Sequence, residues 1–277
     1  MALAAALTAA LLFTGGVAAG AFGALLGLGG GVLIVPLLTL GFGYSLPSAV
    51  GTSLICVIAT SSGAAAHYVR TNRADVRLGV TLEAATALGG IVGGALAAVL
   101  LEEVVAGFFA ALMYYTAFTL ARTRTVASPS DTLAPSPGAP AGAEAPAYRS
   151  TRLPAALAGS FFAGNVSGLL GVGGGVVKVP VIHLIMGAPM SVAIATSNFI
   201  IGVTAAAGAF FYVFRGDVDP VVAGPVVLGV FAGAFLGSRL ASRVKPGWLR
   251  LIFVVVVLYV AVQMTLRAAA PALGGAA

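Results

Sequence analysis

Long apolar segments separated by short polar interruptions run along the whole chain. A helix that crosses the hydrocarbon core of a bilayer needs about 20 apolar residues. Segments of this kind lie near residues 3–26, 46–69, 78–101, 104–121, 153–170, 189–214, 221–241 and 248–266, and two shorter ones lie near 30–43 and 174–187. Because irregular backbone cannot face lipid, the pattern predicts an all-α polytopic membrane protein with 8–10 helical segments, two of them short or re-entrant.

Composition supports a membrane protein and argues against several other classes. The chain is 60% hydrophobic and 8% charged, which leaves too little polar surface to cover a water-soluble globule. Its one cysteine, Cys56, cannot form an intramolecular disulfide. No spacing of cysteine, histidine and carboxylate residues fits a nucleophile with its base or a metal site, so we expect neither an enzyme nor a cofactor. Lys and Arg, which give the net charge of +6, cluster between apolar segments as in cytoplasmic loops, not as in a nucleic-acid site.

One segment differs in kind from the rest of the chain. Residues 122–152 hold five prolines among Ser, Ala and Gly, a composition that cannot bury enough apolar surface to fold. We therefore expect a first membrane unit over residues 1–121 and a disordered cytoplasmic linker over 122–152. A second membrane unit over 153–268 and a C-terminal tail over 269–277 complete the expected organisation.

The two membrane units share sequence features in one register. Residues 27–31 read Gly-Leu-Gly-Gly-Gly and residues 171–175 read Gly-Val-Gly-Gly-Gly, an offset of 171 − 27 = 144 residues. The same offset aligns further identical residues without a gap: Pro36 with Pro180, Gly43 with Gly187, Thr52-Ser53 with Thr196-Ser197, Gly89 with Gly233, and Gly93 with Gly237. A register kept over so long a stretch indicates two homologous repeats.

Equivalent loops of the two repeats carry opposite charges. The loop at 70–77 contains three arginines, whereas its equivalent at 215–219 contains one arginine and two aspartates. Glu102 and Glu103 precede the fifth segment, whereas the corresponding stretch of the second repeat, 239–250, carries four basic residues. Since basic loops face the cytoplasm, we predict that the repeats are inverted in the membrane. Parallel repeats remain an alternative if both short segments are re-entrant.

Each repeat places its glycine cluster directly before a short apolar run that contains a proline. About a dozen helical residues reach about 18 Å, less than the hydrocarbon core of about 30 Å. A helix that begins at Gly30 or Gly174 presents unpaired N–H groups and the positive end of its dipole, and glycine lets an anion approach the backbone. We predict that the two helix starts line one anion site. The alternative is that the glycines only permit a turn or a close helix crossing.

Hydroxyl and amide donors follow the glycine clusters on otherwise apolar helices, where they are suited to bind oxyanions. In membrane helices such residues also bond the backbone or a neighbouring helix. Asn165 and Ser167 precede the second cluster and are weaker candidates. The predicted substrate-binding residues are Gly29, Gly30, Gly31, Thr52, Ser53, Gly173, Gly174, Gly175, Lys178, Thr196, Ser197 and Asn198.

Three titratable residues lie inside apolar segments. Lys178 stands where the first repeat has Ile34. An ammonium at membrane depth is expensive, so we predict that it draws an anion to the site; the alternative is that its side chain snorkels to the interface. Glu83 is interpreted as a residue that snorkels or pairs with the basic loop before it, and His183 as a buried packing residue. A role in proton transfer is the alternative for either.

The pattern Gly-x-Gly-Gly-Gly-x-x-x-x-Pro occurs once per half, at 27–36 and 171–180, and is followed by Thr-Ser at 52–53 and 196–197. It resembles the TauE/SafE family of sulfite exporters and related permeases over nearly the whole chain apart from the linker. Lys178 departs from the family pattern, in which an aliphatic residue is usual at this position.

This resemblance implies a secondary transporter of sulfite, organosulfonate or related sulfur-containing or carboxylate anions. We expect such a carrier in a bacterial inner membrane, working by alternating access between its repeats. The small anion and the lipid bilayer are its expected partners, and a homo-oligomer is left open. A passive anion channel, or a structural or assembly subunit of the membrane, remains the alternative.

Overall fold

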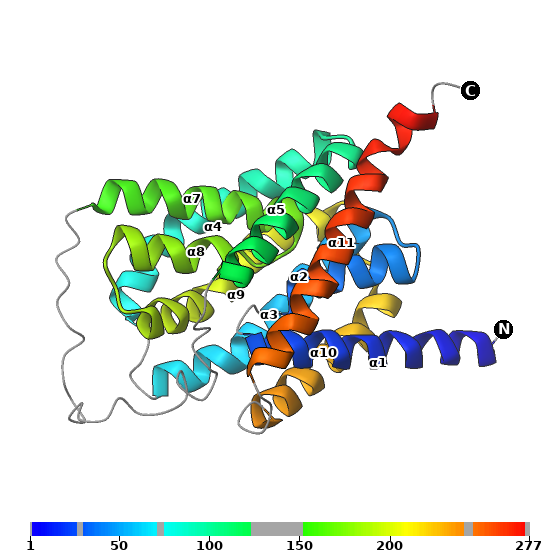
Figure 1. The fold of residues 1–277 in the computed structure, drawn as a ribbon, viewed down its shortest axis with the longest axis horizontal. Helices are drawn as coiled ribbons and strands as arrows, with labels where there is room; N and C mark the ends of the chain where they lie inside the picture. Colours follow the sequence, from blue (N-terminus) through cyan, green and yellow to red (C-terminus); the bar gives the residue numbers. More distant parts are fainter. Residues whose placement is uncertain (1, 27–29, 71–74, 123–151, 241–245, 275–277) are drawn as a thin grey trace.

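The computed structural model describes residues 2–26, 30–70, 75–122, 152–240 and 246–274. Gly29 of the predicted site and nearly all of the predicted linker lie outside these residues. The described elements are α1 (Ala2–Leu26), α2 (Gly31–Pro36), η1 (Leu37–Gly41), α3 (Leu46–Arg70), α4 (Val76–Val99), α5 (Glu102–Arg122), α7 (Leu153–Leu170), α8 (Gly175–Pro180), η2 (Val181–Ile185), α9 (Met190–Phe214), α10 (Pro220–Leu240) and α11 (Pro246–Gly274) (Figure 1).

The predicted all-α membrane fold is confirmed. Within the described ranges every regular element is a helix, and seven helices are long and apolar enough to cross a membrane. The two short segments are present as continuous apolar helices over Gly31–Gly41 and Gly175–Ile185. One boundary differs from the expectation, because α11 continues to Gly274, into the segment expected to be a tail. The protein is therefore a multi-pass membrane protein.

Each short helix changes its hydrogen-bonding register at a proline. Pro36 ends α2 and Pro180 ends α8, and in both cases the next five residues form a π-helical turn, η1 or η2. Proline has no N–H to donate to the carbonyl four residues earlier, so the regular α-helical ladder cannot continue through it unchanged. Both short segments therefore contain the same interruption at the same distance from their glycine cluster.

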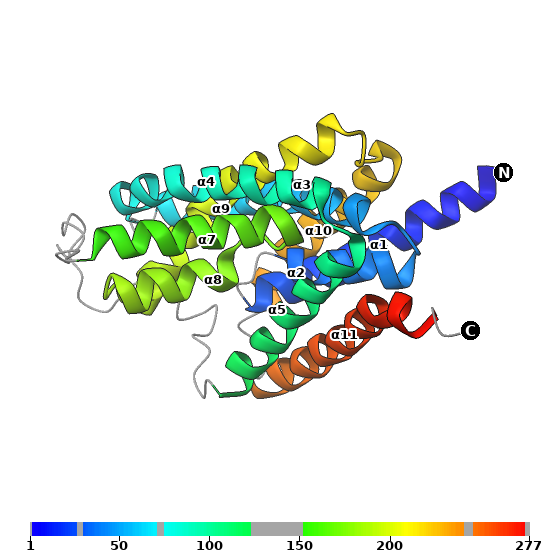
Figure 2. The same cartoon turned by 90° about the horizontal axis from the view of Figure 1, so that it is seen from above.

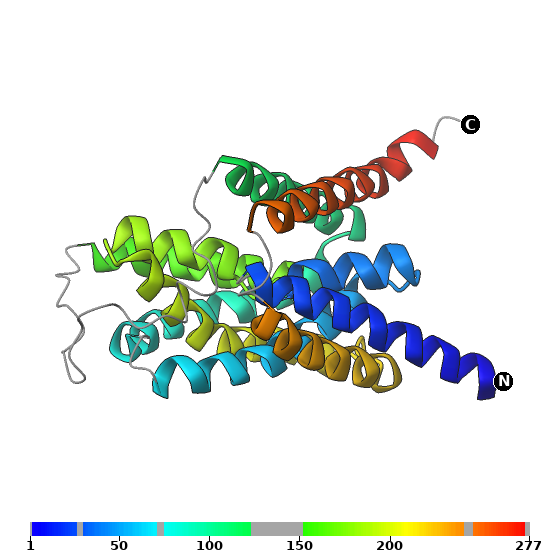
Figure 3. The ribbon, with the colours of Figure 1, turned by 60° about the horizontal axis from the view of Figure 1, so that its bottom comes forward.

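Helices α1 and α7, which are equivalent under the 144-residue offset, run in opposite directions. In Figure 1 α1 starts at the right-hand N-terminus and runs to the left, whereas α7 starts at the left and runs to the right; Figures 2 and 3 show the same directions. Both helices end towards the middle of the long axis, next to α2 and α8 (Figure 1). Opposite directions are what inverted repeats require, and the repeat relation itself remains a prediction.

The long helices pack in pairs, and each pair combines one helix of the first half with one helix of the second half. Helix α1 packs against α10 and α4 packs against α7, while α3 packs against α9 and α5 against α11. Under the offset the α1–α10 pair becomes the α7–α4 pair, and the other two pairs map onto themselves. The two halves are therefore interlaced, and α3 of the first half lies against α9 of the second half.

Glycines allow the closest of these helix crossings. An added Cβ at Gly89 would overlap the carbonyl oxygen of Phe161, and one at Gly93 would overlap that of Asn165, so α4 and α7 touch backbone to backbone. The equivalent contacts in the other pair are those of Gly233 with Val17 O and of Gly237 with Ala21 O. Small residues at such seams are how membrane helices gain packing without a hydrophobic driving force.

Large apolar side chains cover the outside of the bundle as well as its core. Phe109, Tyr212 and Phe253 are fully buried, while Leu88 and Phe108 are among many large apolar residues that are exposed. A water-soluble protein avoids so large an exposed apolar surface, whereas the hydrocarbon core of a bilayer accommodates it.

Candidate functional site

Both short helices begin at a glycine in the left-handed conformation. Gly30 has φ 77° and Gly174 has φ 75°, values at which a residue with a Cβ is strained. The carbonyls of these two residues accept the first hydrogen bonds of their helices, from Leu33 N at 3.1 Å and from Val177 N at 3.1 Å. The helices therefore start where the sequence predicts, and the glycines are required by the backbone at these points.

The glycine segments of the two halves meet in the interior. A Cβ added to Gly31 would lie 2.9 Å from the carbonyl oxygen of Gly171, so the start of α2 touches the second glycine cluster. The hydroxyl of Ser53 donates to Gly171 O at 2.7 Å and also lies 3.2 Å from Gly31 O. One side chain of α3 thus bridges both glycine segments.

Each helix start rests on the equivalent face of a central helix. A Cβ added to Gly31 would lie 2.8 Å from the side chain of Val57 on α3, and a Cβ added to Gly175 would lie 2.8 Å from the side chain of Ile201 on α9. Each helix start therefore packs tightly against its central helix. Ser197, which is equivalent to Ser53, has its hydroxyl 3.9 Å from the same position at Gly175. Gly30, Gly31 and Gly171–Gly175 are all buried, so both helix starts lie in the interior of the bundle.

Three buried hydroxyls on α3, α7 and α9 have no hydrogen-bond partner among the described residues: those of Thr52, Ser167 and Ser197. Buried polar groups are nearly always hydrogen-bonded, and an unsatisfied one costs about 1–3 kcal/mol. Ser167 Cβ lies 3.2 Å from the position of a Cβ at Gly174, so Ser167 and Ser197 flank the second helix start. These hydroxyls are available to an oxyanion that enters between the halves.

Two predicted site residues are placed differently. Thr196 is fully buried, and its hydroxyl accepts a hydrogen bond from the backbone N–H of Asp75 at 3.0 Å, next to the start of α4. Asn198 is half-buried. Thr196 therefore ties α9 to the N-terminus of α4, while the hydroxyl of Ser197, the next residue, is not bonded to protein.

The family model described as "Sulfite exporter TauE/SafE" matches residues 12–264 of the chain. The chain belongs to the TauE/SafE family. It is 27% identical over 259 residues to the probable membrane transporter protein YunE of Bacillus subtilis strain 168, an alignment that covers 90% of this chain and 94% of that protein. It is 24% identical over 256 residues to the probable membrane transporter protein MJ0441 of Methanocaldococcus jannaschii, covering 87% and 89% of the two chains. No solved structure gives a significant match.

This TauE/SafE protein is therefore a membrane transporter, and one part of its interior departs from the sequence interpretation. Lys178 is only 1% exposed, and its Nζ lies 3.4 Å from Glu83 Oε2 and donates to Thr204 Oγ1. The alternative that Lys178 snorkels is wrong, because its ammonium is held between α4 and α9. The interpretation of Glu83 was also wrong, because this residue is only 9% exposed and its carboxylate pairs with Lys178 in the interior.

His183 also differs from the expectation. Its side chain is exposed rather than buried, and its Nδ1 lies 2.8 Å from the carbonyl oxygen of Ala188. The ring joins η2 to the turn that follows it, at the end of the short segment. The exposure arises because Leu184 and His183 lie on the outward side of the π-helical turn, while Val181 and Ile182 are buried.

Sequence reasoning did not anticipate the roles of Thr204 and Thr86. Thr204 Oγ1 donates to Glu83 Oε1 at 2.8 Å, and Thr86 Oγ1 donates to Glu83 Oε2 at 2.7 Å. A signal was present, because Glu83 and Lys178 are opposite charges inside apolar segments, and buried charges are found paired. Thr204 thus bonds the carboxylate oxygen that faces away from the lysine, and Thr86 bonds the same oxygen, Oε2, as Lys178.

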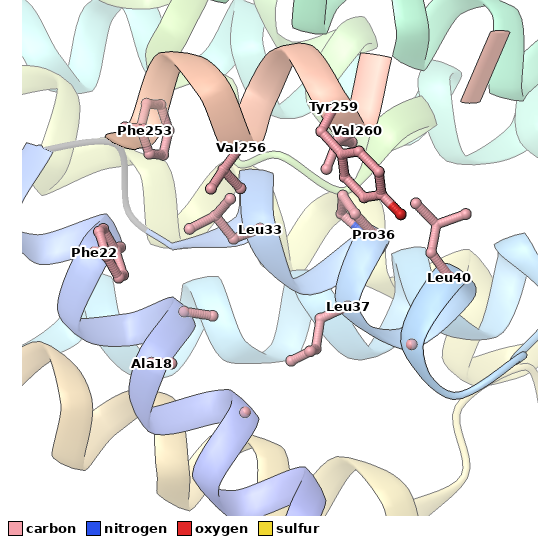
Figure 4. A pocket seen from close by; sticks show the side chains of 13 residues that line it. Ala18, Phe22, Leu33, Pro36, Leu37, Leu40, Phe253, Val256, Tyr259 and Val260 are labelled. Atoms are coloured by element: carbon pink, nitrogen blue, oxygen red, sulfur yellow. The ribbon is translucent and has the colours of Figure 1, made fainter. Parts of the chain in front are cut away.

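Two pockets differ in their chemistry. A pocket of about 410 Å³ between α1, α2, η1 and α11 is lined by apolar side chains, with the Tyr259 hydroxyl at its edge (Figure 4). This lining offers an anion no charged group and only the Tyr259 hydroxyl as a side-chain donor. A smaller pocket of about 150 Å³ is lined by Val50, Tyr212, Glu102 and Arg215 among others. Val50, which lines this pocket, also lies against Gly171.

Proposed function

We propose that this protein is a secondary transporter of a small anion in a bacterial inner membrane, carrying sulfite, an organosulfonate or a related sulfur-containing or carboxylate anion. The observation that carries the proposal is the meeting of the two glycine segments, Gly31 against Gly171, beside the hydroxyls of Ser167 and Ser197, which are buried and have no hydrogen-bond partner among the described residues. Backbone N–H groups at helix starts and free hydroxyls are donors, which an oxyanion needs.

The binding residues follow from this arrangement. Gly30, Gly31, Gly173, Gly174 and Gly175, with Gly29 outside the described part, give the backbone approach. The hydroxyls of Thr52 and Ser197 donate to anion oxygens, with Ser167 as an added donor. Ser53, Thr196 and Asn198 hold the glycine segments and neighbouring helices in place or enter the site when the halves move.

Alternating access uses the interlaced halves. The pocket beside Tyr212 and Arg215 is the opening on the side of the acidic loops, which the charge rule places outside the cell. Rocking of one half against the other about the α3–α9 contact opens the glycine site to each side in turn. The buried state of the helix starts supports a carrier over an open channel, because a channel needs a continuous aqueous path.

Transport by purified protein in liposomes tests the proposal. Vesicles receive radiolabelled sulfite, thiosulfate or sulfoacetate, with protein-free vesicles as the blank, and accumulation above the external concentration is followed under imposed ion gradients. Concentrative uptake of one of these anions supports a carrier. Folded protein that moves none of them refutes the proposal, and flux that only runs downhill identifies a channel. Lys178→Ile in the same assay reports whether the buried cation is needed.

A further inference from the structure

We propose that Glu83 is the proton-binding residue of this transporter, because the transported anion and the Glu83 carboxylate compete for Lys178. The inference rests on the proposed anion transport and deepens it by naming the coupling ion and the residue that carries it.

The geometry is a closed cluster of two charges and two hydroxyls. The carboxylate of Glu83 lies 3.4 Å from Lys178 Nζ, and it accepts hydrogen bonds from Thr204 Oγ1 at 2.8 Å and Thr86 Oγ1 at 2.7 Å. Thr86, Thr204 and Lys178 are at most 1% exposed. The cluster joins three helices, α4, α8 and α9, in the interior of the bundle.

The cluster borders the candidate anion site. Gly175, which opens α8, rests on Ile201 of α9, and Lys178 lies one helical turn further along α8 and contacts Thr204 of α9. Ser197, Ile201 and Thr204 are spaced i, i+4 and i+7 on α9 and so lie on one face of that helix. The backbone of Lys178 is therefore about one turn, about 5 Å along the helix axis, from the second helix start, and its ammonium contacts the helix, α9, on which that start rests.

The other half shows that the fold does not require this charge pair. Under the 144-residue offset Lys178 corresponds to Ile34 and Glu83 corresponds to Val227, while Thr204 corresponds to Thr60. Ile34 is fully buried, so an apolar residue fills the equivalent place. A buried ion pair is commonly no more stabilising than well-packed apolar residues of similar volume. We infer that the pair is kept for transport.

No other charged group competes with Lys178 for Glu83 among the described residues of the helices around it. The range Leu153–Leu170 of α7 holds no titratable side chain, and α9 holds only Tyr212, whose hydroxyl donates to Gly168 O at 3.0 Å. Arg77, at the start of α4, and His183, in η2, are both exposed. The protonation of Glu83 is therefore linked to Lys178 and to whatever negative charge approaches it.

The exchange balances in charge and atoms. While Glu83 is ionised, its negative charge balances the positive charge of Lys178, and binding of a second negative charge beside the pair is disfavoured. When one proton adds to a carboxylate oxygen of Glu83, Lys178 is released to pair with the anion. No bond in the anion changes, and release of the anion lets the proton leave as the carboxylate returns to Lys178. Each bound anion therefore takes up one proton.

Anion binding as a function of pH tests the inference. Thiosulfate, which remains a dianion near neutral pH, is titrated calorimetrically into protein in lipid nanodiscs. Because one proton binds with each anion, the apparent Kd should rise about tenfold for each unit by which the pH is raised, over the range in which Glu83 is ionised in the protein without anion. Repeating the titration in two buffers of different ionisation enthalpy should show uptake of one proton per anion. Glu83→Gln should remove both the slope and the proton uptake, whatever its absolute affinity, whereas the matched change Glu103→Gln should keep both.

Each outcome decides the inference. A slope that Glu83→Gln abolishes supports it; a wild-type Kd independent of pH, or a slope that survives Glu83→Gln, overturns it. If the single variant does not fold, the double variant Lys178→Ile/Glu83→Val replaces it; because it also lacks the Lys178 cation it should bind more weakly, with a Kd that does not change with pH, and retention of the slope refutes the assignment. Failure of thiosulfate, sulfite and sulfoacetate to bind at any pH overturns the proposed anion transport itself, which separates the two failures.

Discussion

The buried pair of Lys178 and Glu83 makes a quantitative prediction about stability. Replacing Lys178 by Ile leaves the carboxylate of Glu83 with only the two threonine hydroxyls as partners, inside the bundle. Replacing Glu83 by Val leaves the Lys178 ammonium with one hydroxyl oxygen as acceptor. Removing one partner of a buried ion pair costs about 3–5 kcal/mol, because the other charge is left uncompensated. Each single variant should therefore be strongly destabilised.

The double variant Lys178→Ile/Glu83→Val should recover most of that loss. It recreates the residues found at the equivalent positions of the first half, Ile34 and Val227, and leaves no unpaired charge. For a chain of this size about 1 kcal/mol shifts Tm by about 2–4 °C, so the single variants should fall by about 6–20 °C and the double variant by much less.

Thermal unfolding of the purified protein in detergent measures this double-mutant cycle, with the fluorescence of the single tryptophan, Trp248, as the signal. Additive losses, in which the double variant is as unstable as the sum of its parents, would show that the two side chains do not interact. That result would also remove the structural basis of the proton-coupling inference.

Three further predictions follow from the packing. Gly93→Ala should separate α4 from α7 and cost about 1–3 kcal/mol or more, whereas Gly224→Ala, where an added Cβ meets no atom within 4 Å, should leave Tm unchanged in the same unfolding assay. Ser53→Ala should cost about 1–3 kcal/mol and lower transport, because Gly171 O loses its buried donor; Ser53→Thr should restore part of the Tm if that bond is the reason. Cys56 is fully buried, so a maleimide should label it only after denaturation, as mass spectrometry would show.

Most of the fold was predictable, because the signal is local. Apolar length marks each helix, and the predicted segments differ from the observed helices by a few residues at most ends. The glycine clusters and the prolines recur at one offset, which predicts two short helices that start at Gly30 and Gly174. The end of α11 was missed because an alanine-rich stretch reads equally well as a helix or as a tail.

The charge cluster was not predictable to the same degree, because it depends on which helices become neighbours. Glu83 and Lys178 are 95 positions apart in sequence, and Ser53 and Gly171 are 118 apart. Local pattern places Glu83 within reach of the basic loop before it, and only the packing of α4 against α9 turns it towards Lys178. The rule that buried charges are paired would have linked the two residues without the structure, whereas the threonines required it.

The comparison of the two halves separates scaffold from chemistry. Positions that agree across the offset, such as Gly89 with Gly233 and Gly93 with Gly237, make the same backbone contacts in both halves and therefore build the helix crossings. Where a charge in one half corresponds to an apolar residue in the other, as at Lys178 with Ile34 and Glu83 with Val227, the scaffold does not require the charge. The proton-coupling inference builds on this difference, because the proposed anion would pair with a positive charge that can be released. We therefore assign the proposed coupling chemistry to Lys178, in the second glycine motif, together with Glu83 of α4.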